Sequence, residues 1–569
     1  MTTFRENTGP GAEGAGPDQA VADEDQAAAA PDQVAAGPGQ AVADEDQAAA
    51  APDQVAAGPG QAVADDDQGA AAPDQVAAGQ ASAPAGPWWR AAPTRLVRLV
   101  RRHWIFASAL ALAVVPRVVA MLAFQPAGLF RLDTYDYLWG AVHVSPNVVN
   151  PSGYSLFLWL LGPFHSLWLV AALQHLLGLG IATMVYALVR RYGLPDWGAT
   201  LAAVPVLFDP GQILLEQFVL ADLLAMALMV GAFGILLWRS PPSMWQVITA
   251  GLMTGASVTV RPTTLPLVLL VPLFLLLRRL GWRKAGASLL AGVIPVVGYM
   301  SWFAAVHGSF NVTNSNGLFL WSRTMSFANC AVIKPPADLR ALCPTAQPGR
   351  LGEANPSRRL PPKLYLWNHG TWPWRDEPSG FVPDTAAFTQ ANNDRALRFA
   401  IMAIKAQPFS YIRVVAQETA ESFVTANNLY FSRWMAHALE VGPATQPYAY
   451  ASVKGYLGGT GGIPAHASDF HGTPRLQSPY AQLINGYQRV IFLPGPVFAL
   501  IVLTGLVGII LPRRRTAAAA LLWVSAAILM ILPVAEHDYT YRYVLPAVPL
   551  VCIAAAIALR KPGHETAQT

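Results

Sequence analysis

Charged residues are scarce in this chain of 569 residues. Asp, Glu, Lys and Arg make up 13% of it, whereas 53% is hydrophobic and the mean hydropathy is +0.34. A soluble globular protein carries about 25% charged residues. The deficit argues against that class and predicts a polytopic membrane protein. The sequence also contains no nucleic-acid-binding motif, so we predict no nucleic-acid partner.

Cysteine is rare as well, with three residues in the whole chain. Cys330 and Cys343 lie in one polar stretch, FANCAVIKPPADLRALC, whereas Cys552 lies in an apolar run. If the polar stretch is outside the cytoplasm, Cys330 and Cys343 are predicted to form a disulfide. That disulfide would close a loop and carry no chemistry, and Cys552 is predicted to be a packed thiol.

The N-terminal segment, residues 1–89, has few basic residues and few large apolar side chains that could form a core. It holds 15 of the 34 acidic residues and one base, Arg5. Residues 16–79 contain three copies of a 21-residue unit rich in Ala, Pro and Gly and free of aromatic residues. Such a unit cannot offset its ordering entropy by burial, so residues 1–89 are predicted to be a disordered acidic tail. The rest of the chain is basic, which suits contact with anionic lipids and phosphate.

Ten apolar segments follow the tail and predict an all-α membrane protein with about ten transmembrane helices. They are residues 103–124, 166–189, 196–215, 217–238, 244–260, 263–277, 285–305, 490–511, 517–534 and 543–559. Four further regions result. They are an N-terminal transmembrane module (90–305), a large extracytoplasmic region (306–489), C-terminal transmembrane helices (490–561) and a short cytoplasmic tail (562–569).

The charges between the segments predict an orientation. With the N-terminus inside, every cytoplasmic connection is basic, as the positive-inside rule requires. These connections hold Arg190–Arg191, Arg239, Arg278 to Lys284, Arg513–Arg515 and Arg560–Lys561. The acids near the segment ends, with region 306–489, fall on the other side. We therefore expect both termini in the cytoplasm, the active site outside it, and a location in the cytoplasmic (inner) membrane.

Region 306–489 has one clearly regular part. Residues 392–423 read as two amphipathic helices that are broken at Pro408 and lie on the membrane surface. The run YLWNHGTWPW, residues 365–374, offers Trp367, His369 and Trp372 as contacts for an acceptor. Aromatic residues are equally suited to anchoring at the membrane interface, so both roles stay open for this run.

The stretch RLDTYDYLWG, residues 131–140, places an acid close to the membrane boundary. Asp133 follows the first apolar segment by about nine residues and precedes NPSGYSLFLWLLGP, residues 150–163, which is apolar but too short to span. A carboxylate held in such a place has the position and partial desolvation that a general base needs. The alternative is a helix cap or a solvated loop acid.

Four stretches together resemble the GT-C superfamily of membrane glycosyltransferases, in particular protein mannosyltransferases and aminoarabinose transferases. They are RLDTYDYLWG, NPSGYSLFLWLL, GLMTGASVTVRPTTLPLVLL (residues 251–270) and YRYVLPAVPLVCIAAAIAL (residues 541–559). The resemblance implies a polyprenyl-phosphate-linked sugar donor, a hydroxyl acceptor and inversion. Asp133 takes the place of the family's essential first-loop Asp, so the resemblance implies a catalytic role for it.

Two arginines are candidates for binding the donor phosphate. Arg261 precedes Pro262 at the extracytoplasmic end of an apolar segment, and Arg542 lies in EHDYTYRYVLP. Guanidinium groups bind phosphate oxygens in a bidentate way and stabilise a departing phosphate. The alternatives are snorkelling for Arg261 and a structural salt bridge with Glu536 or Asp538 for Arg542.

Further charges fall inside apolar segments, where an ionised group is costly and needs a partner or a task. Asp222 and Glu216 are candidates for contacting the donor, and Asp222 could instead orient Arg261. Arg117 is expected to be a structural partner of an acid. No metal ligand is predicted, because Thr134 follows Asp133 where the family often has a second acid, and no H-x-x-x-H spacing occurs. No cofactor is assigned, and a divalent metal is left open.

The sequence thus predicts a membrane glycosyltransferase that moves a sugar from a polyprenyl-phosphate carrier to a hydroxyl of a cell-envelope glycan, lipid or protein. Two other classes compete with this interpretation. A transporter or flippase of lipid-linked sugars would also have many spans and buried charges, but it is expected to show an internal repeat, and none is visible across the spans. A non-catalytic scaffold that binds a glycolipid would need the run 365–374 but not Asp133.

Overall fold

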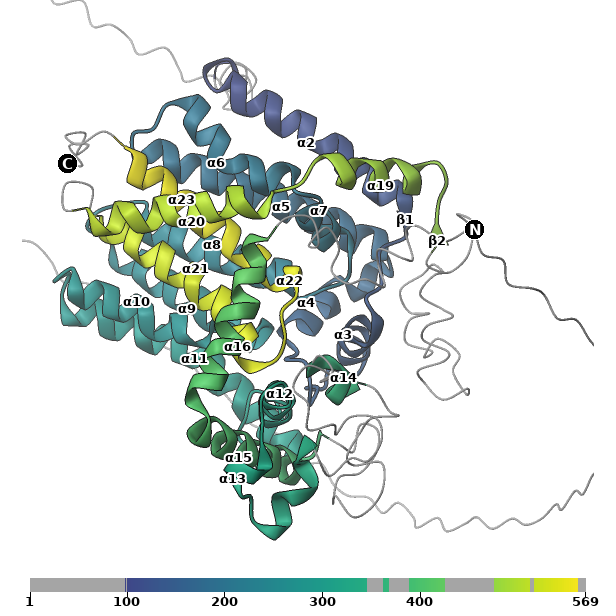
Figure 1. The fold of residues 1–569 in the computed structure, drawn as a ribbon. Coiled ribbons are helices and arrows are strands. Elements are labelled where there is room, and N and C mark those ends of the chain that lie inside the picture. Colours follow the sequence, from purple (N-terminus) through teal and green to yellow (C-terminus); the bar gives the residue numbers. More distant parts are fainter. Residues whose placement is uncertain are drawn as a thin grey trace, which may run out of the picture. The chain divides into compact units, whose positions relative to one another are not determined.

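Helices make up nearly all the regular structure of the computed structural model, which describes residue 98 and residues 100–344, 362–367, 388–424, 475–511 and 516–560 (Figure 1). The predicted tails, residues 1–89 and 562–569, lie outside these ranges. The longer helices up to the end of the N-terminal module are α2 (Trp104–Ala123), α3 (Arg131–His143), α4 (Gly153–Leu161), α5 (Leu167–Arg191), α6 (Asp196–Phe208), α7 (Pro210–Gln217), α8 (Asp222–Leu237), α9 (Met244–Val260), α10 (Leu265–Leu277) and α11 (Trp282–His307).

Ten further α-helices are described after α11. They are α12 (Asn316–Thr324), α13 (Cys330–Ile333), α14 (Pro362–Trp367), α15 (Gln390–Ala406), α16 (Pro408–Ala420), α19 (Tyr480–Val490), α20 (Gly495–Ile510), α21 (Ala517–Glu536), α22 (Tyr541–Val544) and α23 (Val548–Leu559). Short 3₁₀ turns include η1 (Gly162–Phe164), η2 (Pro262–Thr264), η3 (Ala337–Leu342), η8 (Glu421–Phe423) and η10 (Leu545–Ala547). Strands β1 (Phe124–Gln125) and β2 (Arg475–Leu476) pair antiparallel, with Phe124 opposite Leu476.

The chain is a polytopic helical membrane protein, as the composition predicts. Among the described residues, five helices are long and apolar enough to cross a membrane: α2, α5, α11, α21 and the combined α22–α23 segment, Tyr541–Leu559. Two bent pairs bring the number to seven if each is one span. They are α6 with α7, bent by 53°, and α19 with α20, bent by 55°.

The predicted number of about ten spans is confirmed only in part. Every predicted segment contains a helix, but α8, α9 and α10 have 16, 17 and 13 residues. A helix needs about 20 residues to cross a bilayer. These helices pack against one another or against α11, α5 and α21, so much of their surface is covered by protein.

Both bends have a cause in the sequence. Helix α6 ends at Phe208, and α7 starts with Pro210 behind an Asp209 cap, whose carboxylate accepts the Gln212 N–H at 3.2 Å. Proline lacks the N–H that would continue the preceding helix and fits the first turn of a new one. Pro494 likewise precedes the first residue of α20. The chain therefore breaks at both places.

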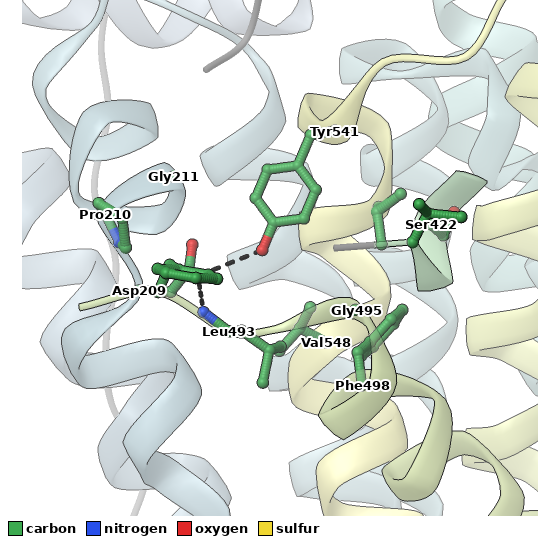
Figure 2. Close-up of a pocket in the computed structure, with 12 residues that line it drawn as sticks. Asp209, Pro210, Gly211, Ser422, Leu493, Gly495, Phe498, Tyr541 and Val548 are labelled. Carbon is green, nitrogen blue, oxygen red and sulfur yellow. Dashed lines mark hydrogen bonds between the residues drawn. The ribbon is translucent and has the colours of Figure 1, made fainter. Parts of the chain in front are cut away.

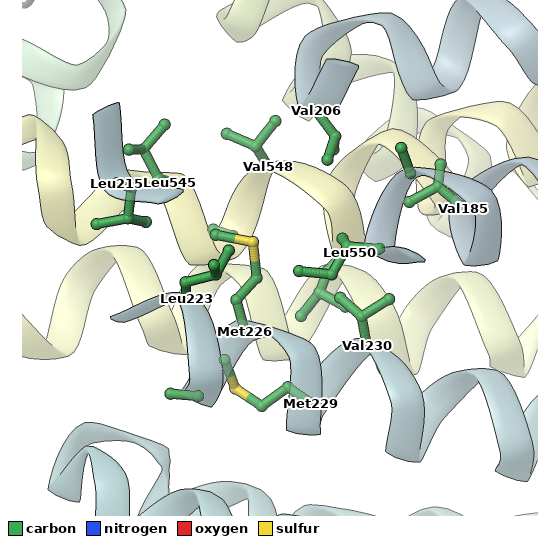
Figure 3. Packing of buried hydrophobic residues seen from close by; sticks show 14 of the residues in the cluster. Val185, Val206, Leu215, Leu223, Met226, Met229, Val230, Leu545, Val548 and Leu550 are labelled. Atoms are coloured by element: carbon green, nitrogen blue, oxygen red, sulfur yellow. The ribbon is translucent and has the colours of Figure 1, made fainter. Parts of the chain in front are cut away.

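Helix α23 lies at the centre of the bundle. It contacts α5, α6, α20 and α21, and 89% of the span that contains it is buried (Figure 1). Figure 3 shows Met226 and Val230 of α8 beside Val548 and Leu550 of α23. The last apolar stretch of the sequence is therefore a core helix that faces protein on nearly every side.

Small residues bring α9 and α11 close together. A Cβ atom on Gly255 would lie 2.1 Å from the carbonyl oxygen of Gly292, and one on Gly251 would lie 2.4 Å from that of Ser288. Helices in membranes use such small-residue spacing to let backbones approach. This contact fixes the direction of α9, which ends immediately before Arg261.

The described part of region 306–489 confirms two predictions. Cys330 and Cys343 form a disulfide. Helices α15 and α16 lie on either side of Gln407, so the predicted break at Pro408 is present. Helix α15 packs on α12, and α16 reaches α21 (Figure 1). Their position on a membrane surface stays a prediction.

A buried ion pair joins α2 to the bend between α6 and α7. Arg117 donates to both oxygens of Glu216, at 2.7 and 2.9 Å, and to the carbonyl oxygen of Leu207 at 2.7 Å. Glu216 also contacts Nδ1 of His175 at 2.9 Å and accepts from Gln212 at 3.0 Å. Arg117 thus has the structural role that its position predicts, and it binds a carbonyl left open by the bend.

Removing the negative charge of this pair should destabilise the fold. Glu216→Gln would leave the Arg117 guanidinium buried without its counter-charge, and the free energy of unfolding should fall by about 3–5 kcal/mol. Denaturant unfolding in mixed micelles measures this change. Asp338→Asn is the matched control, because Asp338 pairs with Arg398 on the surface and such pairs contribute about 0–1 kcal/mol. Equal losses in the two variants would contradict the prediction.

Candidate functional site

Four of the charged residues selected from the sequence meet at one place. Asp133 lies in the first turn of α3, Asp222 is the first residue of α8, Arg261 follows α9, and Arg542 belongs to α22. We call these four side chains the charge cluster. Asp133 and Arg542 are 409 positions apart in the sequence.

Asp222 is the centre of the charge cluster. Its Oδ1 pairs with Nη1 of Arg261, and its Oδ2 lies 3.5 Å from Nε of Arg542. Arg542 in turn donates from Nη1 to Oδ2 of Asp133 at 2.8 Å. The order of contacts is therefore Arg261, Asp222, Arg542, Asp133, with charges that alternate in sign.

The members of the cluster differ in their access to solvent. The side chain of Asp222 is 1% exposed, and those of Arg542, Arg261 and Asp133 are 9%, 15% and 23% exposed. Asp222 is placed at the N-terminus of α8, where the helix dipole favours a negative charge. Asp133 is the more exposed of the two carboxylates, whereas Asp222 lies between the two arginines.

Aromatic rings orient both guanidinium groups. The ring of Tyr543 lies 4.7 Å from Cζ of Arg261 and 5.3 Å from Cζ of Arg542, and Phe130 lies 4.8 Å from Cζ of Arg542. Planar guanidinium groups stack on such rings and keep their donors free at the edge. The sequence reasoning missed both rings. Their positions in the sequence could have indicated them, since Phe130 closely precedes Asp133 and Tyr543 directly follows Arg542.

Arg542 does not have the acidic partners that its neighbourhood in the sequence suggests. A salt bridge with Glu536 or Asp538 is the alternative to phosphate binding for Arg542, but its carboxylate partners are Asp133 and Asp222. Within the described residues no ion pair joins Arg542 to either nearby acid. That alternative is wrong, because α22 turns the arginine toward α3 and α8.

Glu216 is not part of the charge cluster. Its side chain is fully buried and belongs to the network with Arg117, His175 and Gln212. The structure therefore does not present Glu216 to a donor, and its predicted donor contact is corrected to a structural role. The predicted acceptor contacts His369 and Trp372 lie outside the described residues, as does the side chain of Trp367.

Asp209 ties the cluster to the two helix bends (Figure 2). Its Oδ2 accepts the backbone N–H of Leu493 at 3.0 Å and the hydroxyl of Tyr541 at 3.2 Å. Leu493 precedes α20, and Tyr541 is the neighbour of Arg542. Figure 2 shows the carboxylate between these groups in a small cavity whose other walls include Ser422, Phe498 and Val548. The backbone that carries Arg542 is thereby fixed from the α6–α7 side.

A second crevice borders the cluster on the side of Arg261. It is lined by Met229, Arg261, Thr263, Thr264, Leu529, Pro533, Tyr543 and Pro546. These residues come from α8, η2, α21 and the α22–η10 segment. Met229, Leu529, Pro533 and Pro546 form its apolar walls, and the polar groups of the lining belong to Arg261, Thr263, Thr264 and Tyr543.

Nothing in the described part of the chain forms a ready metal site. No group of three His, Cys, Asp or Glu side chains is close enough there to hold an ion. Two of the histidines have protein partners: His307 contacts the carbonyl oxygen of Pro146 at 2.7 Å, and His537 contacts the hydroxyl of Ser322 at 3.0 Å. The carboxylates of the cluster are engaged by arginines.

Asp136 lies one helical turn after Asp133 on α3 and is partly buried. Its Oδ2 accepts from Nδ2 of Asn150 at 2.8 Å. Burial is the main cause that raises the pKa of Asp136 to about 7. The charge of Asp133 adds to this effect, and the hydrogen bond from Asn150 opposes it.

This raised pKa predicts a pH-dependent stability. Between pH 3.8 and about 7 the folded protein keeps a proton on Asp136 that the unfolded chain has released. The free energy of unfolding should therefore fall as pH rises through this window. In Asp136→Asn that part of the fall should disappear, because an amide does not ionise. Unfolding in detergent at several pH values measures the difference, and parallel curves for the two proteins would contradict it.

Comparisons with known proteins give two distant structural matches. No family model matches the sequence, and no curated protein matches it. The apo structure of ArnT from Cupriavidus metallidurans matches with a TM-score of 0.30 and 12% identity, over 81% of this chain and 77% of that one. The apo oligosaccharyltransferase from Archaeoglobus fulgidus matches with a TM-score of 0.31 and 15% identity, over 79% of this chain and half (50%) of that one. At these TM-scores the activity of this chain has to be argued from its own residues.

Proposed function

We propose that the protein is a GT-C-like membrane glycosyltransferase. It moves a sugar from a polyprenyl-phosphate carrier to a hydroxyl acceptor, with inversion at the sugar. The observation that carries this proposal is the charge cluster, in which an accessible carboxylate and two oriented guanidiniums meet at one end of the bundle. A base for the acceptor and cations for the leaving phosphate are the groups that such a transfer needs.

The two arginines would hold the donor phosphate. Arg261 and Arg542 share Asp222 and the ring of Tyr543, so their donors lie close to one another. Apolar side chains of α8 and α21 lie beside Arg261, and the first isoprene units of the carrier would pack against this side of the cluster. A phosphate at this point would be near both lipid and solvent, as a lipid-linked sugar requires.

Donor binding would also release the base. In the free protein Arg542 holds Asp133 at 2.8 Å. A phosphate that takes this guanidinium leaves Asp133 available for the acceptor hydroxyl. The acceptor O–H then gives its proton to Asp133, and its oxygen forms a bond to the anomeric carbon. The bond from that carbon to the phosphate oxygen breaks, and the polyprenyl phosphate leaves with the electron pair.

The acceptor would enter from region 306–489. We propose that this region lies on the extracytoplasmic side of the membrane. Our candidates for contacting the acceptor remain Trp367, His369 and Trp372. The acceptor class is a cell-envelope glycan, lipid or protein that presents a hydroxyl. A divalent metal is not needed in this scheme, since the guanidiniums supply the positive charge.

The arrangement of basic residues supports a cytoplasmic location for the end of the helix bundle that lies away from the charge cluster. Arg191, Arg278 and Arg560 all interact electrostatically with the hydroxyl of Tyr192, so three predicted cytoplasmic connections lie together. Helix α8, which begins at Asp222, ends beside Trp238, whose carbonyl oxygen accepts from Arg191. Helix α10, which follows Arg261, ends immediately before Arg278. We therefore propose that both termini face the cytoplasm and that the charge cluster faces outward from the inner membrane.

Loss of the base should abolish transfer. In Asp133→Asn, label transfer from a pool of radiolabelled polyprenyl-phosphate sugars to membrane acceptors should fall by about a hundredfold or more, as expected for a lost general base. Protein level and folding are checked by size exclusion in detergent. Asp338→Asn, an exposed acid of the outer region, is the control and should keep wild-type activity. Equal transfer by wild type and Asp133→Asn would remove Asp133 from the mechanism.

The same assay separates the rival functions. A flippase would move labelled donor across the membrane without forming a covalent product. A scaffold would bind donor or glycolipid equally well with and without Asp133, and would lose binding when Trp367 and Trp372 are replaced. If wild type forms no product from any donor in the pool, the enzyme proposal fails.

The role of the arginines gives a separate expectation. Arg261→Lys keeps the charge but removes the bidentate donor pair and the stacking on Tyr543. The KM for the donor should rise by about tenfold or more, as expected when a hydrogen bond to a charged group is lost. The KM for the acceptor should not change. Steady-state kinetics with each substrate varied in turn measure the two values, and a change confined to the acceptor would contradict the assignment.

A further inference from the structure

The turn between α21 and α22, residues 537–540, leads to Arg542 and is held by helices α12 and α16 of region 306–489. Nη1 of Arg323, in α12, donates to the carbonyl oxygens of His537 at 3.1 Å and Val534 at 3.4 Å. The hydroxyl of Tyr411, in α16, donates to the carbonyl oxygen of Ala535 at 2.9 Å. The last turn of α21 thus has its open carbonyls bound by side chains of α12 and α16.

Arg323 is itself fixed by an ion pair with α16. Its Nη1 and Nη2 donate to the two oxygens of Glu418 at 2.6 and 2.5 Å. Oε2 of Glu418 also accepts the backbone N–H of Tyr539 at 3.2 Å. The pair therefore contacts the turn at two points, through a carbonyl of His537 and through the N–H of Tyr539.

The burial of this pair requires an explanation. The side chain of Arg323 is 0% exposed and that of Glu418 is 19% exposed. Burying a guanidinium is costly, and replacing a buried ion pair by apolar residues often leaves stability unchanged or improves it. A positive charge at a helix C-terminus is favourable, but a lysine or a hydroxyl could satisfy those carbonyls. The bidentate pair of Arg323 and Glu418 does more, because it holds the turn in a defined position relative to α12 and α16.

That turn leads directly to the charge cluster. Tyr539 and Arg542 are separated by two residues, and Tyr541 between them is held by Asp209 from the other side. The backbone before Arg542 is therefore bound by Glu418 and Arg323 on one side and by Asp209 on the other. The guanidinium of Arg542 then reaches Asp133 at 2.8 Å.

We propose that Arg323 and Glu418 are positioning residues that set the place of Arg542 in the charge cluster. This inference rests on the proposed function, in which Arg542 binds the donor phosphate. It gives the helices α12 and α16 a part in donor binding, in addition to any contact that region 306–489 makes with an acceptor. Neither side chain touches the reacting groups, because each acts through the turn.

The test compares donor kinetics in Arg323→Lys and Glu418→Gln with wild type. Lysine keeps the charge but cannot bind both Glu418 oxygens and the carbonyls together, and glutamine removes the ionic part of the pair. Each variant should raise the KM for a polyprenyl-phosphate sugar or lower transfer by about ten- to a hundredfold, the range expected from a small misplacement of a binding group. Folded yield and melting temperature are measured in parallel.

Two controls separate positioning from a loss of structure. Arg398→Lys changes an ion pair of the same outer region, with Asp338 at 3.2 Å, that does not touch the turn. It should keep wild-type kinetics. Arg542→Lys provides a double-mutant cycle: in that background Arg323→Lys should change donor KM by less than about twofold, since coupled residues are not additive.

The outcomes are distinct. If wild type transfers sugar but Arg323→Lys and Glu418→Gln keep both its donor KM and its rate of transfer, the positioning role is wrong while the proposed function stands. The positioning role would also be wrong if Arg323→Lys had the same effect on donor kinetics with and without Arg542→Lys. It would be wrong as well if the loss of transfer matched the loss of folded protein. If Arg323→Lys does not fold, Glu418→Gln carries the test. If wild type transfers nothing, the proposed function fails and this inference fails with it.

Discussion

The candidate site depends on one interaction, the sharing of the Asp222 carboxylate by two arginines. This carboxylate is almost fully buried and lies between the guanidiniums of Arg261 and Arg542. A buried charge without a partner is strongly destabilising, so each of these groups requires the other two. Asp133 completes the set by pairing with Arg542. Two negative and two positive charges thus hold together four chain segments that are far apart in the sequence.

The two helix bends allow polar and charged side chains to be bound inside a bundle of membrane helices. At both bends the chain leaves the helical path, and Asp209 binds the N–H of Leu493 and the hydroxyl of Tyr541 across them. Ends of helices carry unsatisfied backbone groups, which bind polar side chains and ions. The buried polar contacts of Asp209 therefore lie at helix ends, while α23 and its neighbours form an apolar core (Figure 3).

Much of the candidate site could be predicted from the sequence because charge is rare in it. Asp133, Asp222, Arg261 and Arg542 stand out in or beside apolar runs, and the structure brings these four together. Partners were harder to predict. For Arg542 the nearby acids Glu536 and Asp538 were the alternative partners, and Glu216 was a candidate for contacting the donor. Pairing depends on which helix ends meet, and sequence distance carries no information about that.

The sequence by itself determined the class of the protein, the places of its helices and the Cys330–Cys343 disulfide. Hydrophobic run length and proline positions act locally, so they can be read from neighbouring residues. Only the tertiary structure decided how many helices are long enough to span and which charges pair. It also revealed Arg323 and Glu418, whose importance lies in contacts with a turn more than a hundred positions away. Buried charges find their partners through packing, and packing joins residues without regard to their order in the chain.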